Sequence, residues 1–158
     1  MRKATIRMLV FIAVLFIAGC SLMRPPPVRE VKGPRVVCIL FNEKRFKIEV
    51  VGRLTGVLSR KGFQVVIGSV KDAKYYKPGD YGAVVYMAEL WAWHTPLHAK
   101  RYYKNNHQPG NVVFVVTSAV PDVVIKKPFD AVTSASRPDK AEPVAQEIMV
   151  RLDTILEK

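Results

Sequence analysis

Cysteine is scarce in this sequence, and the patterns that mark many enzymes are missing. There are two cysteines among 158 residues, Cys20 and Cys38, so neither a disulfide framework nor a cysteine-rich metal cluster is available. The sequence contains no glycine-rich dinucleotide motif, and no nucleophile with its base can be recognised. A self-contained hydrolase therefore has little support. Acidic residues are also few, 13 against 25 basic ones, which predicts a basic surface or an anionic ligand.

The length and the hydrophobic content predict one globular domain. Of the 158 residues, 49% are hydrophobic. This is enough for a single core, while the chain is too short for two ordinary domains. The net charge of +12 would suit an anionic membrane surface, a nucleic acid or an acidic ligand.

The first twenty residues have the features of an export signal that ends in a lipidation site. A basic head precedes the apolar run MLVFIAVLFIAG, which has the length of a signal-peptide core and is short for a bilayer span. The run leads into Ile17-Ala18-Gly19-Cys20, which resembles the bacterial lipobox. We predict a signal peptide over residues 1–19 and a lipid on Cys20. An uncleaved anchor helix is the alternative.

Residues 20–34 are predicted to form a lipidated tether. The triple proline in SLMRPPPVREVKGP favours a stiff segment, which reaches roughly 40 Å at ~3.1 Å per residue. Ser21 in place of Asp after the cysteine resembles the pattern of lipoproteins that are forwarded to the outer membrane of a diderm cell. With Cys20 lipidated, Cys38 has no disulfide partner, and its apolar neighbours predict an inert core residue.

The charge stays positive when the signal is removed. Three of the 25 basic residues and none of the 13 acidic ones lie in residues 1–19, so the mature chain carries a net charge of +9. A lipid anchor does not need this charge, which is therefore a property of the surface or of a ligand. An exported chain rarely meets nucleic acid, and we expect no such partner. The basic stretch AKRYYKNN is predicted to be a solvated helix face or, alternatively, a contact to anionic envelope polymers or lipids.

The folded part is predicted over residues 35–158, where strand-like and helix-like segments alternate. Runs rich in β-branched residues without polar alternation are typical of parallel strands that are covered on both faces. The predicted strands are 35–41, 63–68, 83–88, 112–117 and, more polar and suited to an edge, 130–135. This alternation predicts a doubly wound parallel α/β sheet.

Polar residues predict where the intervening helices begin. Thr95 followed by Pro96 indicates an N-cap and a first helical residue, and Asp139 with Glu142 indicates a capping box. Apolar residues four apart predict the faces that pack on the sheet. These are Phe46, Val50, Leu54 and Leu58 in a helix over 46–60, and Val144, Ile148, Leu152 and Ile155 in the last helix.

Five strands, with the segments DYGAVVYMAELWAWHTPLHAKRYYKNN and GNVVFVVTSA, resemble the flavodoxin family. The resemblance covers residues 35–157 and implies the strand order 2-1-3-4-5. It also implies a ligand site at the carboxyl ends of strands 1, 3 and 4, where the order reverses. Flavodoxins bind FMN there, with a first loop rich in Ser, Thr and Gly around the phosphate.

The first loop of this chain departs from that pattern. NEKRFK contains no Gly, Ser or Thr, and Glu43 is negative. Lys44 and Arg45 lie at a predicted helix N-terminus, where the helix dipole favours anions, while Asn42 is a candidate N-cap. Lys44 and Arg45 predict a phosphate site built from side chains, or else Lys44, Arg45 and Lys47 form a solvated basic first turn.

The other two loops hold the remaining candidates. Trp91 and Trp93 are the only tryptophans, and either could serve as a flavin platform or pack against the sheet end. His94 follows them in the same loop, and Thr117 and Ser118 offer hydroxyl groups after strand 4.

The sequence has too few ligands for a metal site and too few residues for a full helix between the last two strands. His94 and His98 lie four apart near Glu89, but two imidazoles do not specify a metal site. The short connection between strands 4 and 5 predicts that the fourth helix is reduced or missing.

Two functions of different classes fit these residues. The first is a lipid-anchored, non-enzymatic binding or accessory module with a degenerate cofactor site and an envelope protein as partner. The second is an FMN-binding electron-transfer or quinone-reductase-like protein. The sequence specifies neither the partner nor the oligomeric state.

Overall fold

The computed structural model describes residues 31–90, 94–107, 110–118 and 131–157. The predicted signal peptide, Cys20 and most of the tether lie outside these residues. Among the helices in the described ranges, none combines the length and the apolar character that a membrane span requires.

The predicted strands form one parallel sheet in the order β2-β1-β3-β4-β5. The sheet is therefore doubly wound and has the expected order. The predicted bounds are correct to within two residues. The strands are β1 Gly33–Phe41, β2 Gln64–Ser69, β3 Tyr81–Glu89, β4 Val112–Ser118 and β5 Ala131–Ala135.

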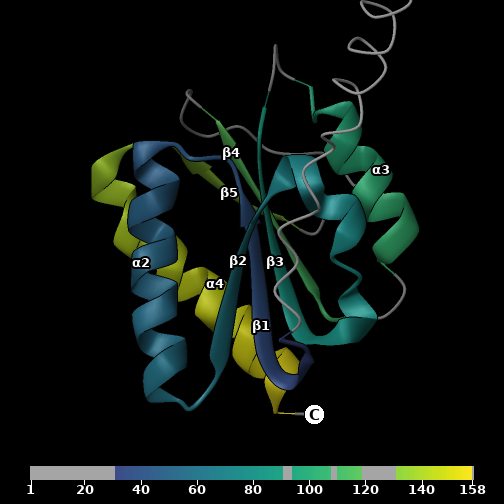
Figure 1. Cartoon of the computed structure of the whole chain (residues 1–158). Helices are drawn as coiled ribbons and strands as arrows, with labels where there is room; N and C mark the ends of the chain where they lie inside the picture. Colours follow the sequence, from purple (N-terminus) through teal and green to yellow (C-terminus); the bar gives the residue numbers. More distant parts are fainter. Residues whose placement is uncertain (1–30, 91–93, 108–109, 119–130, 158) are drawn as a thin grey trace, which may run out of the picture.

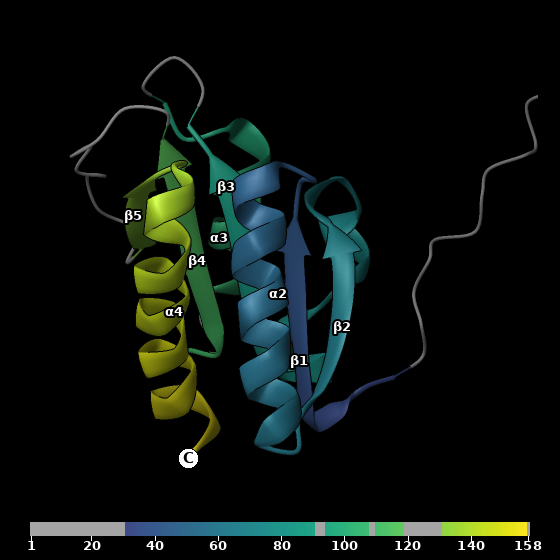
Figure 2. The same cartoon turned by 90° about the vertical axis from the view of Figure 1, so that its left-hand side faces the viewer.

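The two faces of the sheet are covered differently. Helices α2 (Arg45–Arg60) and α4 (Ala141–Leu156) lie side by side on one face (Figures 1 and 2). The other face carries α3 (Leu97–Asn106) and two short 3₁₀ helices, η1 (Val70–Tyr75) and η2 (Pro78–Asp80) (Figure 1). The connection from β2 to β3 therefore contains short 3₁₀ turns in place of a long α-helix.

Alternate residues of the strands enter two separate hydrophobic clusters. Val37, Ile39 and Val85 pack under α2 and α4, while their neighbours Cys38 and Val84 pack under η1 and α3. This alternation is the period-2 geometry of a strand, and it explains why the strand sequences show no polar face. Cys38 is buried and has no disulfide, which confirms the prediction of a core residue.

Two of the predicted helix starts are wrong. Pro96, not Thr95, precedes the first residue of α3, and it provides no side-chain cap. The capping box at Asp139 does not form, because a 3₁₀ turn over Pro138–Lys140 runs directly into α4. Asp139 accepts a hydrogen bond from Arg137 Nε at 3.1 Å instead. The apolar stripe of α4 is as predicted, with Val144, Ile148 and Leu152 buried.

The fourth helix was predicted to be reduced or missing between β4 and β5. Residues 119–130 lie outside the described part of the chain, so this prediction stays untested. The remaining elements bring the carboxyl ends of β1, β3 and β4 together at one edge of the sheet (Figure 1).

Candidate functional site

The turn between β1 and α2 is short and closes on itself. It consists of residues 42–44, and the Lys44 amide donates a hydrogen bond to the Asn42 carbonyl at 2.8 Å. Lys44 is the residue that precedes the helix, and its side chain makes no cap. The prediction of Asn42 as the N-cap is therefore wrong, because its side chain is engaged elsewhere.

A cluster of Asn42, Lys47 and Glu89 joins this turn to the end of β3. The Lys47 ammonium donates a hydrogen bond to Asn42 Oδ1, and Asn42 Nδ2 donates to Glu89 Oε2 at 3.3 Å. Lys47 Nζ lies 4.0 Å from the same Glu89 oxygen. The side chain of Lys47 is only 1% exposed, whereas that of Glu89 is 39% exposed. We call these three residues the Lys47 cluster.

Burial changes the acid–base properties of this region. Desolvation lowers the pKa of Lys47 to about 8, with Glu89 acting in the opposite direction and Lys44 in the same one. Burial and the charge of Lys47 also lower the pKa of His98. A charged amine that is this deeply buried requires the carboxylate and the amide oxygen beside it.

A pocket of about 730 Å³ opens beside the Lys47 cluster. It lies at the ends of β1 and β3, the two strands between which the connection order reverses. We call it the switch-point pocket. Its lining combines apolar and charged groups from the turn, the end of β3, η1 and the start of α3. The lining residues are Asn42, Lys44, Val70, Lys71, Ala88, Glu89, Leu90, Pro96 and His98.

The structure brings together some of the predicted site residues and separates others. Asn42 and Lys44 line the switch-point pocket, whereas Arg45 and His94 are exposed and do not line it. Trp91 and Trp93 lie outside the described residues, so their predicted role as a flavin platform is untested.

The predicted hydroxyl groups belong to the last two residues of β4 and do not line the pocket. Thr117 and Ser118 are both buried and are not part of its lining. Thr117 Oγ1 donates a hydrogen bond to the Ala88 carbonyl at 3.2 Å, and the Thr117 carbonyl accepts one from the Leu90 amide at 2.9 Å. Thr117 thus connects β4 to the end of β3.

Lys71 was not considered from sequence, and His98 and Glu89 were considered only as metal ligands. The expectation of a solvated Lys47 is wrong, because this side chain is only 1% exposed. A signal for Lys47 exists, because position 47 shares the helical spacing of Val50, Val51 and Leu54, all of which are buried. The contributions of Lys71 and His98 follow from the packing of η1 and α3 across the sheet end, which no local pattern predicts. Within the described ranges, no group of three or more His, Cys, Asp or Glu could hold a metal ion.

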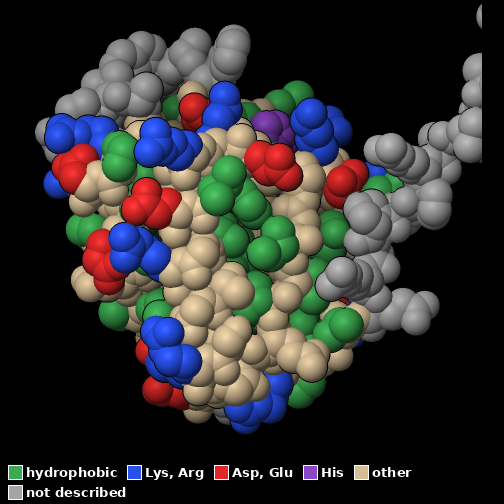
Figure 3. All heavy atoms as spheres, turned by 60° about the vertical axis from the view of Figure 1, so that its left-hand side comes forward, with side chains coloured by type: hydrophobic (Ala, Val, Ile, Leu, Met, Phe, Trp, Pro, Cys, Tyr) green, Lys and Arg blue, Asp and Glu red, His purple; other side chains and the backbone are tan. Residues whose placement is uncertain are grey.

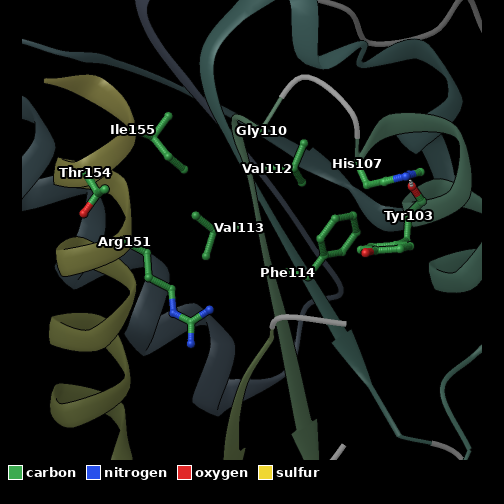
Figure 4. Close-up of a pocket in the computed structure, with 9 residues that line it drawn as sticks. All are labelled: Tyr103, His107, Gly110, Val112, Val113, Phe114, Arg151, Thr154 and Ile155. Atoms are coloured by element: carbon green, nitrogen blue, oxygen red, sulfur yellow. Dashed lines mark hydrogen bonds between the residues drawn. The ribbon is translucent and has the colours of Figure 1, made fainter. Parts of the chain in front are cut away.

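A second hollow lies at the opposite end of the sheet, near the start of β4. It has a volume of about 380 Å³, with His107, Tyr103 and Phe114 on one side and the α4 residues Arg151, Thr154 and Ile155 on the other (Figure 4). Its polar groups are already engaged: His107 Nδ1 is 3.0 Å from the Tyr103 carbonyl, and Arg151 pairs with Glu147 at 3.3 Å. The hollow therefore lacks the convergent polar groups of a ligand site.

No protein-family model and no curated protein match the sequence. Solved structures do match. Oxidised flavodoxin 2 from Bacillus cereus aligns with a TM-score of 0.51 and 10% identity, over 75% of this chain and 97% of that one. A flavodoxin from the domain Archaea aligns with a TM-score of 0.51 and 6% identity, over 76% of this chain and 98% of that one. A flavo di-iron protein from Thermotoga maritima aligns with a TM-score of 0.55 and 10% identity, over 80% of this chain but only 37% of that one.

At these identities the likeness concerns the fold alone. It agrees with the strand order of the sheet. The described domain therefore has a flavodoxin-like fold.

Proposed function

We propose that this chain is a lipid-anchored envelope protein whose flavodoxin-like domain is a non-enzymatic binding or accessory module with a degenerate cofactor site. The observation that carries the proposal is the Lys47 cluster. It lies at the end of β1, beside the turn that in flavodoxins surrounds the FMN phosphate.

A phosphate site needs several amides or hydroxyls that point at one anion. The turn over residues 42–44 has no Gly, Ser or Thr, and the cation next to it, Lys47, is already matched by Asn42 and Glu89. A dianion placed here would meet the Glu89 carboxylate. This supports the proposal that an internal ion pair occupies part of the position that the phosphate loop has in flavodoxins.

FMN binding is the second candidate, and the switch-point pocket is the observation that favours it. A volume of about 730 Å³ lies in the range of small-molecule sites. Lys44 and Lys71 line this pocket and have no ion-pair partner among the described residues. In this alternative the two lysines would bind the phosphate by side chain, and the protein would carry electrons or act as a quinone-reductase-like subunit.

One experiment separates the two candidates. The full-length chain is purified in neutral detergent, its absorbance is recorded between 350 and 500 nm, and FMN is then titrated while flavin fluorescence is followed. The proposed module should be colourless and should not quench FMN at micromolar concentration. A yellow protein, or tight quenching that Lys44→Glu abolishes and the exposed Glu43→Gln leaves intact, would establish the redox function instead.

The anchor is tested separately. In a bacterial host the wild-type chain should sediment with membranes and enter the detergent phase, whereas Cys20→Ala should lose the lipid and remain unprocessed. Mass spectrometry of the mature N-terminus gives the decisive reading: a diacylglyceryl-modified Cys20 supports the anchor, and an intact residue 1–19 segment with no lipid contradicts it. Separation of inner and outer membranes then tests the predicted outer-membrane location.

A further inference from the structure

A groove runs between the two 3₁₀ helices and α3, on the sheet face opposite α2 and α4. It has a volume of about 840 Å³ and is lined by residues of 70–80 on one side and of 98–106 on the other. It shares Val70, Lys71 and His98 with the switch-point pocket. We call it the η–α3 groove.

One rim of the groove is a row of lysines. Lys71, Lys74 and Lys77 recur every third residue, and all three are exposed and line the groove. Lys71 and Lys74 lie in η1, and Lys77 directly precedes η2. In a 3₁₀ helix residues three apart lie above one another, about 6 Å along the axis, so this spacing places Lys71 and Lys74 on the same side. The opposite rim contributes the exposed Arg101.

These four cations have no acidic partner among the residues that the structure describes. The only carboxylate in the groove lining is Asp80, and it pairs with Lys32 at 3.0 Å. Exposed cations that line one hollow create a positive potential there, and an anion is attracted to it. The groove is therefore positively charged and suits an anionic ligand.

The opposite side of the molecule is different. There Arg53 pairs with Glu142 and with Glu49, and Lys61 pairs with Asp153 at 2.7 Å. Acidic and basic side chains lie interspersed on the side where α2 adjoins β2 (Figure 3). What distinguishes the η–α3 groove is therefore that several unpaired cations line one hollow.

Between the cationic rims the lining is largely apolar and includes Tyr76 and Tyr102, which are only 1% and 6% exposed. Tyr102 Oη donates a hydrogen bond to the Tyr76 carbonyl at 3.0 Å, and its ring stacks on Tyr86 with centroids 4.6 Å apart. The wall adds the amide side chains of Asn105 and Asn106.

We propose that the η–α3 groove binds a linear acidic glycan, a sugar polymer that carries carboxylates or phosphates. A row of exposed cations suits charges that repeat along a chain, the apolar part of the lining suits the apolar faces of sugar rings, and the Asn105 amide suits hydroxyl groups. No strand residue lines the groove, so an acidic peptide would find no strand edge for its backbone. This inference goes beyond the proposed function and needs neither the lipid nor a ligand in the switch-point pocket.

The test is a binding titration of the full-length chain in neutral detergent at about 150 mM salt. Fluorescently labelled polygalacturonate supplies carboxylates and labelled dextran phosphate supplies phosphates. Unmodified dextran and poly-L-glutamate are the controls. We expect one or both acidic glycans to bind, with affinity at least tenfold above that for poly-L-glutamate, and no binding of unmodified dextran. Binding of neither acidic glycan overturns the proposal, and equal affinity for poly-L-glutamate shows a charge effect alone and overturns it too.

Matched variants locate the site. The double variant Lys74→Glu and Arg101→Glu changes two groove residues, and Lys100→Glu with Lys104→Glu makes the same change of charge on α3 outside the groove lining. The first should lose at least tenfold in glycan affinity and the second less than threefold. Equal losses would place the binding on diffuse charge and contradict the proposal. Thermal unfolding checks that each variant is folded. If the double variant does not fold, the single variant Lys74→Gln replaces it, and we expect a several-fold loss of glycan affinity.

Discussion

The ammonium of Lys47, in the first turn of α2, lies 4.0 Å from Glu89 Oε2 at the end of β3. The two residues are 42 positions apart in sequence, and Asn42 hydrogen-bonds to both. This contact fixes the start of α2 to the strand next to β1, at the edge of the sheet where the switch-point pocket opens.

Glu89→Ala should destabilise the protein through this contact. The substitution leaves the buried Lys47 ammonium with only the Asn42 oxygen, and because Glu89 is partly exposed we expect a loss of about 1–2 kcal/mol in the free energy of unfolding. Urea denaturation at pH 7 measures it. Glu43→Ala is the control, since Glu43 is exposed and makes no ion pair among the described residues. Equal effects of the two would show that the Lys47–Glu89 contact is not stabilising.

Lys47 should also make stability rise with pH in the mildly alkaline range. Its pKa is about 8 in the folded state against 10.5 for the free side chain, so between these values the unfolded chain binds more protons. The free energy of unfolding then increases with pH, by at most ~1.4 kcal/mol per unit.

The comparison with Lys47→Met isolates this contribution. Burial raises the pKa of Cys38 to about 12. The Cys38 thiol therefore lowers the free energy of unfolding at pH values above its ordinary pKa, and it does so in both proteins. The difference in unfolding free energy between wild type and Lys47→Met should therefore shift in favour of the wild type from pH 7.5 to 9.5. A difference that does not change with pH would mean that Lys47 titrates normally.

Glycine substitutions at two positions should have opposite effects. A Cβ at Gly82 would lie 2.0 Å from the Pro34 carbonyl oxygen, whereas one at Gly52 would meet nothing within 4 Å. Gly82→Ala should cost roughly 2 kcal/mol or more through overpacking against backbone. Gly52→Ala, inside α2, should gain about 0.8–1.0 kcal/mol from helix propensity. The two substitutions should shift the midpoints of thermal and urea unfolding in opposite directions. A Gly82→Ala protein as stable as the wild type would contradict the close approach of β1 and β3.

The buried tyrosines provide another matched pair. Tyr86 Oη has no hydrogen-bond partner in the described structure, while Tyr102 Oη donates to the Tyr76 carbonyl. Tyr86→Phe should be neutral or slightly stabilising, and Tyr102→Phe should cost about 1 kcal/mol. Both variants keep the stacked rings, so chemical denaturation reports the hydroxyl groups. A larger loss for Tyr86→Phe would indicate a partner for its hydroxyl, such as a bound water.

The sheet could be predicted from local sequence because its signals are local. Segments such as Val36 to Phe41 are apolar at every position, and burial on both faces of a parallel strand requires this. The helical spacing of Phe46, Val50 and Leu54 likewise defines the buried face of α2. The capping predictions at Thr95 and Asp139 were wrong because a 3₁₀ turn or a proline altered the backbone just before each helix.

The sequence by itself determined the fold class, the strand order through the family resemblance, and the excess of positive charge. Only the tertiary structure decided where that charge is unpaired and how Lys47 is satisfied. Asn42 meets Glu89 across 47 residues, and Lys74 and Arg101 come from different elements to line the η–α3 groove. Such pairs depend on how one element packs against another. The free energy of that packing comes from the whole core, so the local sequence pattern of either segment does not predict the pair.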